Sequence, residues 1–194
     1  MNTRQKPEEP QSEVSLCGFL PQELTEHIGI SPAFRGRQLF EWIHQKGVLD
    51  FGEMTNLPLR MREDLITAYG TSLSSQVRQV NEDSDGTVKL SLLLHDRSLI
   101  ESVLLTDENG RRTACLSSQV GCALGCSFCR TGMMGLVRDL TAGEIVEQYL
   151  HLRQLYGEIG NIVFMGMGEP LMNLGEVLRG IEIFHHPGGI NSFM

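Results

Sequence analysis

The sequence lacks any apolar run long enough to span a membrane, and it shows no secretory leader. Internal repeats and low-complexity tracts are missing as well. Apolar residues make up 41% of the 194 residues, which is typical of a globular chain with room for one domain and part of another. These features together predict a cytoplasmic protein.

An excess of basic residues is also missing. The formal net charge is −8 at pH 7, whereas proteins that bind nucleic acids usually carry a basic face. Binding depends on where the charges lie, however, and four arginines bracket a cysteine-rich segment: Arg111, Arg112, Arg130 and Arg138. The overall charge therefore argues only mildly against an RNA partner.

Cysteine is scarce and unevenly distributed. The sequence has five cysteines, and Cys122, Cys126 and Cys129 fall within eight positions. A disulfide framework would normally spread an even number of cysteines along a small secreted chain. Clustered thiols in a chain without an export signal instead indicate a metal or redox site in a reducing compartment.

The rhythm of apolar and polar residues predicts an α/β fold in four parts. These are a disordered tail over 1–16, a helical accessory domain over 17–70, a small β-sheet linker over 71–111 and an incomplete α/β domain over 112–194. Within the helical part, Ser31-Pro32 and Asn56-Leu57-Pro58 indicate helix starts, and Gly70 indicates a helix end.

The strand candidates fall into two groups. Residues 87–94 and 98–105 are separated by a turn and predict a small antiparallel sheet. Residues 113–117 and 161–165 are each followed by a loop and a helix, and a capping box at 141–144 opens the first of these helices. Two consecutive βα units imply parallel strands, with the strand at 161–165 left as a bare sheet edge.

The C-x3-C-x2-C spacing of Cys122, Cys126 and Cys129 offers three thiolates from one glycine-containing loop. Structural zinc sites and ferredoxin-type clusters both use four protein ligands. Three thiolates suit a four-iron cluster whose last iron stays open to a substrate's amino and carboxylate groups. Phe128, between the second and third cysteines, could shield such a cluster. The alternative interpretations are a zinc knuckle, with Cys115 or a histidine as fourth ligand, and chance clustering of cysteines.

A glycine-rich turn, GMGEP at 166–170, directly follows the strand candidate at 161–165. In parallel α/β architectures, ligands bind at the carboxyl ends of the strands. Glycines let the backbone approach a ligand closely, and Glu169 offers a carboxylate to an ammonium group. A tight turn with a solvated glutamate would explain the same residues, but the position one βα unit after the cysteines favours a cofactor site.

Together the two motifs resemble the radical S-adenosylmethionine (SAM) superfamily. Residues 113–122 (TACLSSQVGC) and 165–173 (MGMGEPLMN) resemble the cofactor segments of its dual-specificity RNA methyltransferases, and residues 34–57 resemble their N-terminal helical domain. The resemblance covers residues 20–184. It implies that the βα units are the first two of a partial (βα)6 radical SAM barrel, preceded by the helical domain and the small antiparallel sheet.

The resemblance implies an enzyme that methylates carbon 2 of adenine in 23S rRNA and tRNA. Its cofactors would be a 4Fe-4S cluster and SAM, and its reductant an external electron donor of the flavodoxin type. A sister group methylates carbon 8 of the ribosomal adenine, and Pro170 favours the carbon 2 group. A disulfide bond is a further feature that the resemblance implies.

The resemblance also assigns roles to residues. Cys122, Cys126 and Cys129 would ligate the cluster, and Gly168 and Glu169 would bind SAM. Glu101 would accept the proton, and Cys115 would resolve the enzyme–RNA adduct. From the pattern alone, Glu101 would be an outward-facing carboxylate on an amphipathic strand, and Cys115 a small buried residue.

The family's methyl-carrying cysteine has no counterpart here, because no cysteine follows Cys129. Residues 185–194 (HHPGGINSFM) also depart from the family pattern. We therefore expect an inactive, truncated or frame-shifted form of the methyltransferase. The alternative function is a zinc-stabilised RNA-binding module without radical chemistry, which iron content would distinguish.

Overall fold

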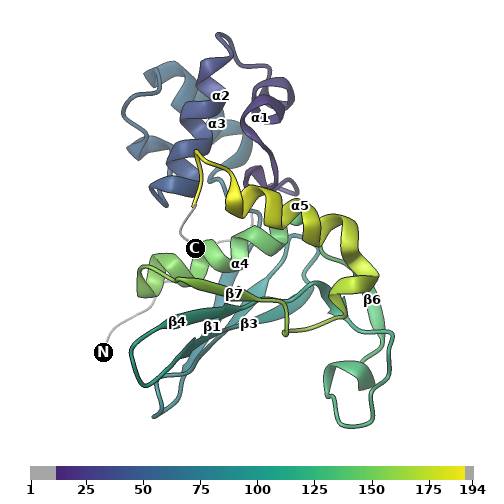
Figure 1. Ribbon diagram of the computed structural model, residues 1–194. Helices are drawn as coiled ribbons and strands as arrows, with labels where there is room; N and C mark the ends of the chain where they lie inside the picture. Colours follow the sequence, from purple (N-terminus) through teal and green to yellow (C-terminus); the bar gives the residue numbers. More distant parts are fainter. Residues whose placement is uncertain (1–11, 191–194) are drawn as a thin grey trace, which may run out of the picture.

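The computed structural model describes residues 12–190. The disordered tail expected over 1–16 therefore lies mostly outside the described residues. The helices expected over 17–70 are present and gather at one end of the molecule (Figure 1). They are the 3-10 turn η1 (Leu16–Gly18), α1 (Pro21–Ile28), α2 (Phe34–Phe40), the π-helical turn η2 (Glu41–Gln45), the 3-10 turn η3 (Phe51–Glu53) and α3 (Leu59–Tyr69).

One predicted helix start is confirmed and the other is wrong. Helix α3 begins directly after Pro58, and it ends at Gly70, which has a φ of 72° and donates its N–H to the Ile66 carbonyl. Helix α2, in contrast, is preceded by Ala33 and not by a Ser31 cap. The Pro32 carbonyl accepts the Arg35 N–H at 3.0 Å, so Ser31 and Pro32 belong to the turn before the helix.

The main sheet has five strands in the order β1-β2-β3-β4-β7. Their bounds are β1 (Gln76–Glu82), β2 (Val88–Leu93), β3 (Leu99–Thr106), β4 (Arg112–Cys115) and β7 (Asn161–Val163). Neighbours from β1 to β4 are antiparallel, whereas β4 and β7 are parallel, as the two βα units predict. The predicted antiparallel strands thus extend the sheet of the βα units and do not form a small sheet of their own.

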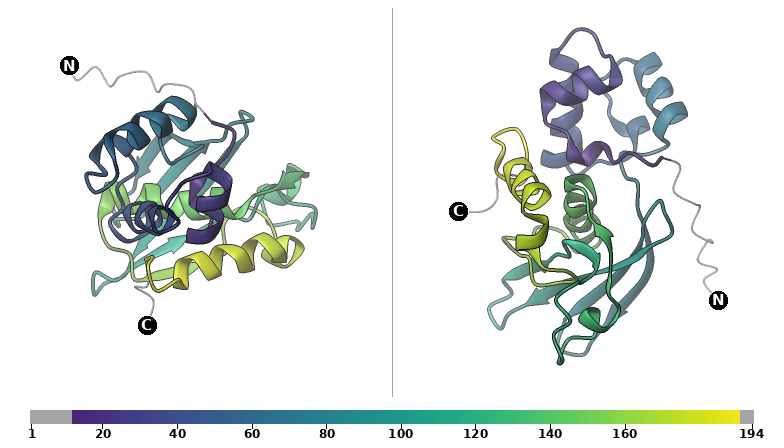
Figure 2. Two further views of the ribbon diagram at one scale, coloured as in Figure 1. Left: turned by 90° about the horizontal axis from the view of Figure 1, so that it is seen from above. Right: turned by 90° about the vertical axis from the view of Figure 1, so that its right-hand side faces the viewer.

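Helices α4 (Ala142–Tyr156) and α5 (Leu174–His185) lie on the same side of this sheet (Figures 1 and 2). Alternate strand residues face them, since Val88, Leu90 and Leu92 are buried while the residues between them are half-buried. The predicted capping box is confirmed: the Thr141 hydroxyl accepts the Glu144 N–H at 3.2 Å, and the Glu144 carboxylate accepts the Thr141 N–H at 2.9 Å. No helix among residues 12–190 is long and apolar enough to cross a membrane.

A buried carboxylate on α4 holds the segment that joins the helical region to the sheet. Glu147 accepts the backbone N–H groups of Ser74 and Ser75 at 2.6 and 2.9 Å and the Ser74 hydroxyl at 3.1 Å. One turn further, a ring nitrogen of His151 lies 3.0 Å from the Ser75 hydroxyl. Burial raises the pKa of Glu147 and lowers that of His151 to about 4.

A second, two-stranded sheet projects from the body of the molecule (Figure 1). It pairs β5 (Gln119–Gly121) with β6 (Leu136–Asp139) in antiparallel fashion, and the 3-10 turn η4 (Thr131–Met133) lies in the connection between them. A further 3-10 turn, η5 (Pro170–Asn173), precedes α5. This hairpin carries the clustered cysteines.

Candidate cofactor site

One loop connects β5 with β6, and the other follows the parallel strand β7. We call them the cysteine loop (residues 122–135) and the glycine loop (residues 164–170). The Leu116 N–H donates to the Val163 carbonyl at 2.8 Å, and the Gly166 N–H donates to the Leu116 carbonyl at 3.1 Å. The Ser118 N–H then donates to the Met167 carbonyl at 2.8 Å. The glycine loop is thus bonded to the segment that leads from β4 into the cysteine loop.

The Ser117 hydroxyl is buried at the centre of this contact. It donates to the Glu101 carbonyl on β3 at 2.5 Å and accepts the Met167 N–H at 2.8 Å. The backbone of Ser117 is bonded to α4, because the Gln148 side chain accepts its N–H at 2.7 Å and donates to its carbonyl at 2.9 Å. A single serine therefore joins β3, the glycine loop and α4.

Gly168 and Glu169, the predicted SAM-binding residues, lie against β5. Gly168 has a φ of 94°, and a Cβ atom there would come within 2.6 Å of the Gln119 Cβ, so only glycine fits without displacement. The Glu169 N–H donates to the Gln119 Oε1 at 2.9 Å. The Glu169 Oε1 accepts the Leu171 N–H at 3.1 Å, and its second carboxylate oxygen offers a further acceptor for a ligand.

The cysteine loop is anchored at both ends and exposed between them. At its base, the Cys122 N–H donates to the Gly135 carbonyl at 3.0 Å. Just beyond it, Arg138 on β6 binds the Glu144 carboxylate with two hydrogen bonds of 2.7 and 2.8 Å and reaches Asp96 at 2.7 Å. The Arg138 guanidinium lowers the pKa of Asp96 to about 2. Arg138 is thus committed to anchoring the hairpin.

The three predicted cluster ligands share this loop, with Cys122 buried and Cys126 and Cys129 half-buried. Phe128 is 90% exposed. Among residues 12–190, no group of three or more Cys, His, Asp or Glu side chains is arranged to hold a metal ion. The structure therefore places the cysteines on one loop without gathering their thiols, and their role as ligands stays a prediction.

The chemistry of the donor set nevertheless fits an iron–sulfur cluster. All three thiols are free, and the backbone N–H groups of Gly132 and Thr131 lower the pKa of Cys129. A lower pKa favours the thiolate, which is the form that binds metal.

Cys115 and Glu101, the predicted reacting residues, lie on one face of the main sheet. Cys115 on β4 pairs with Val103 on β3, and Glu101 lies two residues before Val103, so all three share a face. The alternate residues of β3, Ile100, Ser102 and Leu104, are buried on the opposite face. The Glu101 carboxylate forms an ion pair with Lys89 at 3.0 Å. Burial raises the pKa of Cys115.

The disulfide bond implied by the resemblance is not present in the described chain, where all five cysteines are free. Cys17 lies in η1 and donates to the Ser72 carbonyl at 3.4 Å. Burial and the neighbouring Glu147 carboxylate raise its pKa. A structural role for Cys17 is consistent with this environment.

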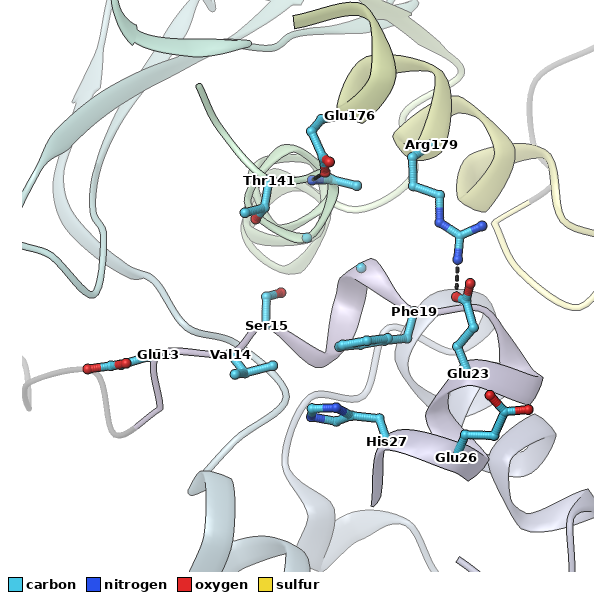
Figure 3. Close-up of a pocket in the computed structure, with 13 residues that line it drawn as sticks. Glu13, Val14, Ser15, Phe19, Glu23, Glu26, His27, Thr141, Glu176 and Arg179 are labelled. Atoms are coloured by element: carbon cyan, nitrogen blue, oxygen red, sulfur yellow. Dashed lines mark hydrogen bonds and ion pairs between the residues drawn. The ribbon is translucent and has the colours of Figure 1, made fainter. Parts of the chain in front are cut away.

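A cavity of about 600 Å³ lies elsewhere, between the N-terminal segment and the helices α4 and α5 (Figure 3). Phe19 stacks on His27 at its wall, with ring centroids 4.5 Å apart, and Arg179 forms an ion pair with Glu23 across it. Its lining contains none of the predicted cofactor or reacting residues. We therefore place the candidate site at the two loops.

Four buried polar residues support the loops, and sequence reasoning gives them no role: Ser117, Gln119, Gln148 and Asn173. Asn173, for example, donates to the carbonyls of Ser118 and Leu140, both at 2.8 Å. The available signal is a polar residue within an otherwise apolar or glycine-rich segment. Such a residue must find a partner when it is buried.

Comparison with known proteins finds two family models that match separate parts of the chain. Residues 14–69 match the family model described as the ribosomal RNA large subunit methyltransferase N-terminal domain, and residues 116–192 match the radical SAM superfamily. A crystal structure of a radical SAM methyltransferase from Sphaerobacter thermophilus superposes with a TM-score of 0.80 at 38% identity, covering 95% of this chain and 54% of that one. The fold and the site together are those of a radical SAM domain behind a helical N-terminal region.

Two curated relatives narrow the assignment. A probable dual-specificity RNA methyltransferase RlmN from Treponema pallidum (strain Nichols) is 47% identical over 90% of this chain and 51% of its own length. Its counterpart from Moorella thermoacetica is 48% identical over 91% of this chain and 52% of its own length. Over the matched residues the chain is similar to the RlmN family of radical SAM dual-specificity RNA methyltransferases. It spans about half the length of the curated relatives it matches.

Proposed function

We propose that the chain supplies the helical N-terminal region and the cofactor loops of a cytoplasmic radical SAM enzyme that methylates carbon 2 of adenine in 23S rRNA and tRNA. The observation that carries the proposal is the bonding of the glycine loop after β7 to residues 116–119, the segment that leads from the parallel strand β4 into the cysteine loop. The names of the relatives support the RNA substrate. An external flavodoxin-type protein is the proposed electron donor.

In this proposal β4–α4 and β7–α5 are the first two units of a partial (βα)6 barrel spanning 112–194. Residues 17–70 form the accessory domain, and the linker over 71–111 extends the barrel sheet through β3. Glu101 and Cys115 lie on the sheet face opposite the buried Ser102 side chain, the face that looks into the interior of such a barrel.

The residues divide the work as follows. Cys122, Cys126 and Cys129 would hold the 4Fe-4S cluster, which supplies reductive cleavage of SAM when bound. Gly168 lets the glycine loop pack directly on Gln119, and the Glu169 carboxylate would accept a hydrogen bond from the ammonium group of SAM.

Two further residues act on the RNA base. Glu101 removes a proton from it, and the Lys89 ammonium at 3.0 Å orients that carboxylate beforehand. Cys115 acts as the thiol that releases the product. The buried position of Cys115 keeps the thiol protonated until it is needed.

Anaerobic reconstitution of the purified chain with ferrous iron and sulfide tests the cluster assignment. We expect about four irons per chain and a visible thiolate-to-iron absorption band, both lost in the triple Cys122→Ala, Cys126→Ala, Cys129→Ala variant. Cys115→Ala is the matched control and should keep the iron. Tight zinc binding without iron uptake, lost in Cys115→Ala, would instead establish the zinc module.

The RNA assignment is tested separately by the binding of tRNA and a 23S rRNA fragment to the reconstituted chain. We expect binding that weakens as salt concentration rises, because phosphate contacts release counterions. A DNA duplex of the same length serves as the control. Normal iron uptake without RNA binding would overturn the assigned substrate while leaving the cofactor assignment intact.

A further inference from the structure

Gln119 is the first residue of β5 and lies three positions before Cys122. Its side chain is 1% exposed, and both ends of its amide are used. The Gln119 Oε1 accepts the Glu169 N–H at 2.9 Å, and the Nε2 donates to the Asp139 Oδ1 at 2.7 Å. One amide thereby touches the glycine loop on one side and the strand that follows the cysteine loop on the other.

The orientation of this amide is fixed by its partners. A backbone N–H can only donate, so it requires the amide oxygen, and a carboxylate can only accept, so it requires the NH₂ group. The same residue is also bonded through its backbone, because the Gln119 N–H donates to the Met167 carbonyl at 3.2 Å. Gly168 packs directly on its Cβ and Cγ atoms.

We propose that Gln119 is a positioning residue that sets the place of Glu169 relative to Cys122, and so aligns the SAM-binding loop with the cluster-binding loop. The inference rests on the proposed function for the identity of the two ligands. The hydrogen bonds of Gln119 themselves do not depend on the proposed function. Gln119 acts through the Glu169 backbone, and Asp139 holds its amide in the required orientation.

The chain offers a cycle of substitutions that preserves side-chain volume. Gln119→Glu places a carboxylate against Asp139 and removes the donor, so the side chain should turn away and release the Glu169 N–H. Asp139→Asn alone should have little effect, because an amide oxygen can still accept from Gln119. The double variant Gln119→Glu, Asp139→Asn restores both hydrogen bonds at unchanged net charge: the side chain at 119 again accepts the Glu169 N–H, and donor and acceptor are exchanged only in its bond to the side chain at 139.

The first measurement is hydrogen exchange of the Glu169 amide in the chain without cofactors, followed by NMR. We expect exchange about tenfold faster in Gln119→Glu, the change that loss of one ordinary hydrogen bond gives. Exchange should return to the original rate in the double variant. A residue that merely fills space would show no such rescue, because the volume of the pair is the same in all four proteins.

The second measurement is SAM affinity by equilibrium dialysis, with iron content determined on the same reconstituted samples. Iron content should be equal in all four proteins, because the cysteines are kept. SAM affinity should fall about tenfold in Gln119→Glu and recover in the double variant. Folding of the double variant where Gln119→Glu fails to fold would also count as rescue.

Unchanged exchange and affinity in Gln119→Glu would overturn the proposal, and so would a double variant that resembles Gln119→Glu in both. Failure of the proposed function looks different. In that case the unsubstituted chain binds neither iron nor SAM, while the exchange cycle at Glu169 still decides whether Gln119 positions the loop.

Discussion

The glycine loop and the cysteine loop are built in opposite ways. The glycine loop is fixed along its length, since Gly166, Met167 and Glu169 all bond to the segment after β4. The cysteine loop is fixed at its base, and its apolar side chains Leu124 and Phe128 are exposed. The chain thus preorganises the loop that would bind SAM and leaves the loop that would bind the cluster adaptable, in keeping with the coupling of metal binding to folding.

The largest test of this difference compares two glycines that both have positive φ. Gly168→Ala should lower the free energy of unfolding by about 3 kcal/mol, from backbone strain and a clash with Gln119. Gly125→Ala should cost about 1 kcal/mol, because φ is 60° but nothing lies within 4 Å of the added atom. Urea denaturation of the chain without cofactors measures both. Equal losses would show that the loops are equally constrained.

A smaller effect is expected from a pair of serines. Ser117→Ala leaves the buried Met167 N–H without its acceptor, which should cost about 1–3 kcal/mol. Ser127→Ala, in the exposed part of the cysteine loop, should change stability by less than about 0.5 kcal/mol. Thermal and urea unfolding provide the comparison. The prediction fails if Ser117→Ala is as stable as Ser127→Ala.

The smallest effect is expected for two thiols, that of Cys129 in the cysteine loop and that of Cys115 on β4. Backbone N–H donors lower the pKa of Cys129, so its thiolate should form at lower pH than that of an ordinary cysteine. Burial raises the pKa of Cys115, so its thiolate should form only at higher pH. Alkylation with iodoacetamide at a series of pH values, followed by mass spectrometry, gives the two midpoints. Equal midpoints would show that the pKa values of the two thiols do not differ.

The sequence predicts those parts of the molecule that depend on neighbouring residues. The capping box at Thr141 and Glu144 and the helix end at Gly70 follow from local hydrogen bonding, and both are present. The parallel pairing of β4 and β7 follows from the alternation of strands and helices. Local rules fail at Ser31-Pro32, because the same dipeptide also fits a turn.

Features that join distant segments could not be predicted in the same way. Strand β1 reads QVRQVNE, which has too few apolar residues to stand out, and β2 supplies its partner. Nothing in the sequence around Gln119 indicates that its amide forms hydrogen bonds with Asp139 and Glu169, 20 and 50 positions further along the chain. The cysteine spacing indicates the type of ligand. It does not indicate how the thiols are arranged, and within residues 12–190 the loop does not bring the three thiols together as a metal site.

The buried carboxylate of Glu147 has a consequence for the order in which the chain matures. Its serine partners on the joining segment precede it by 72 and 73 residues. During synthesis from the N-terminus, the helical region can therefore fold before the Glu147 carboxylate exists to accept the hydrogen bonds of the joining segment. The helical region can take its final position relative to the sheet only after the ribosome has produced α4.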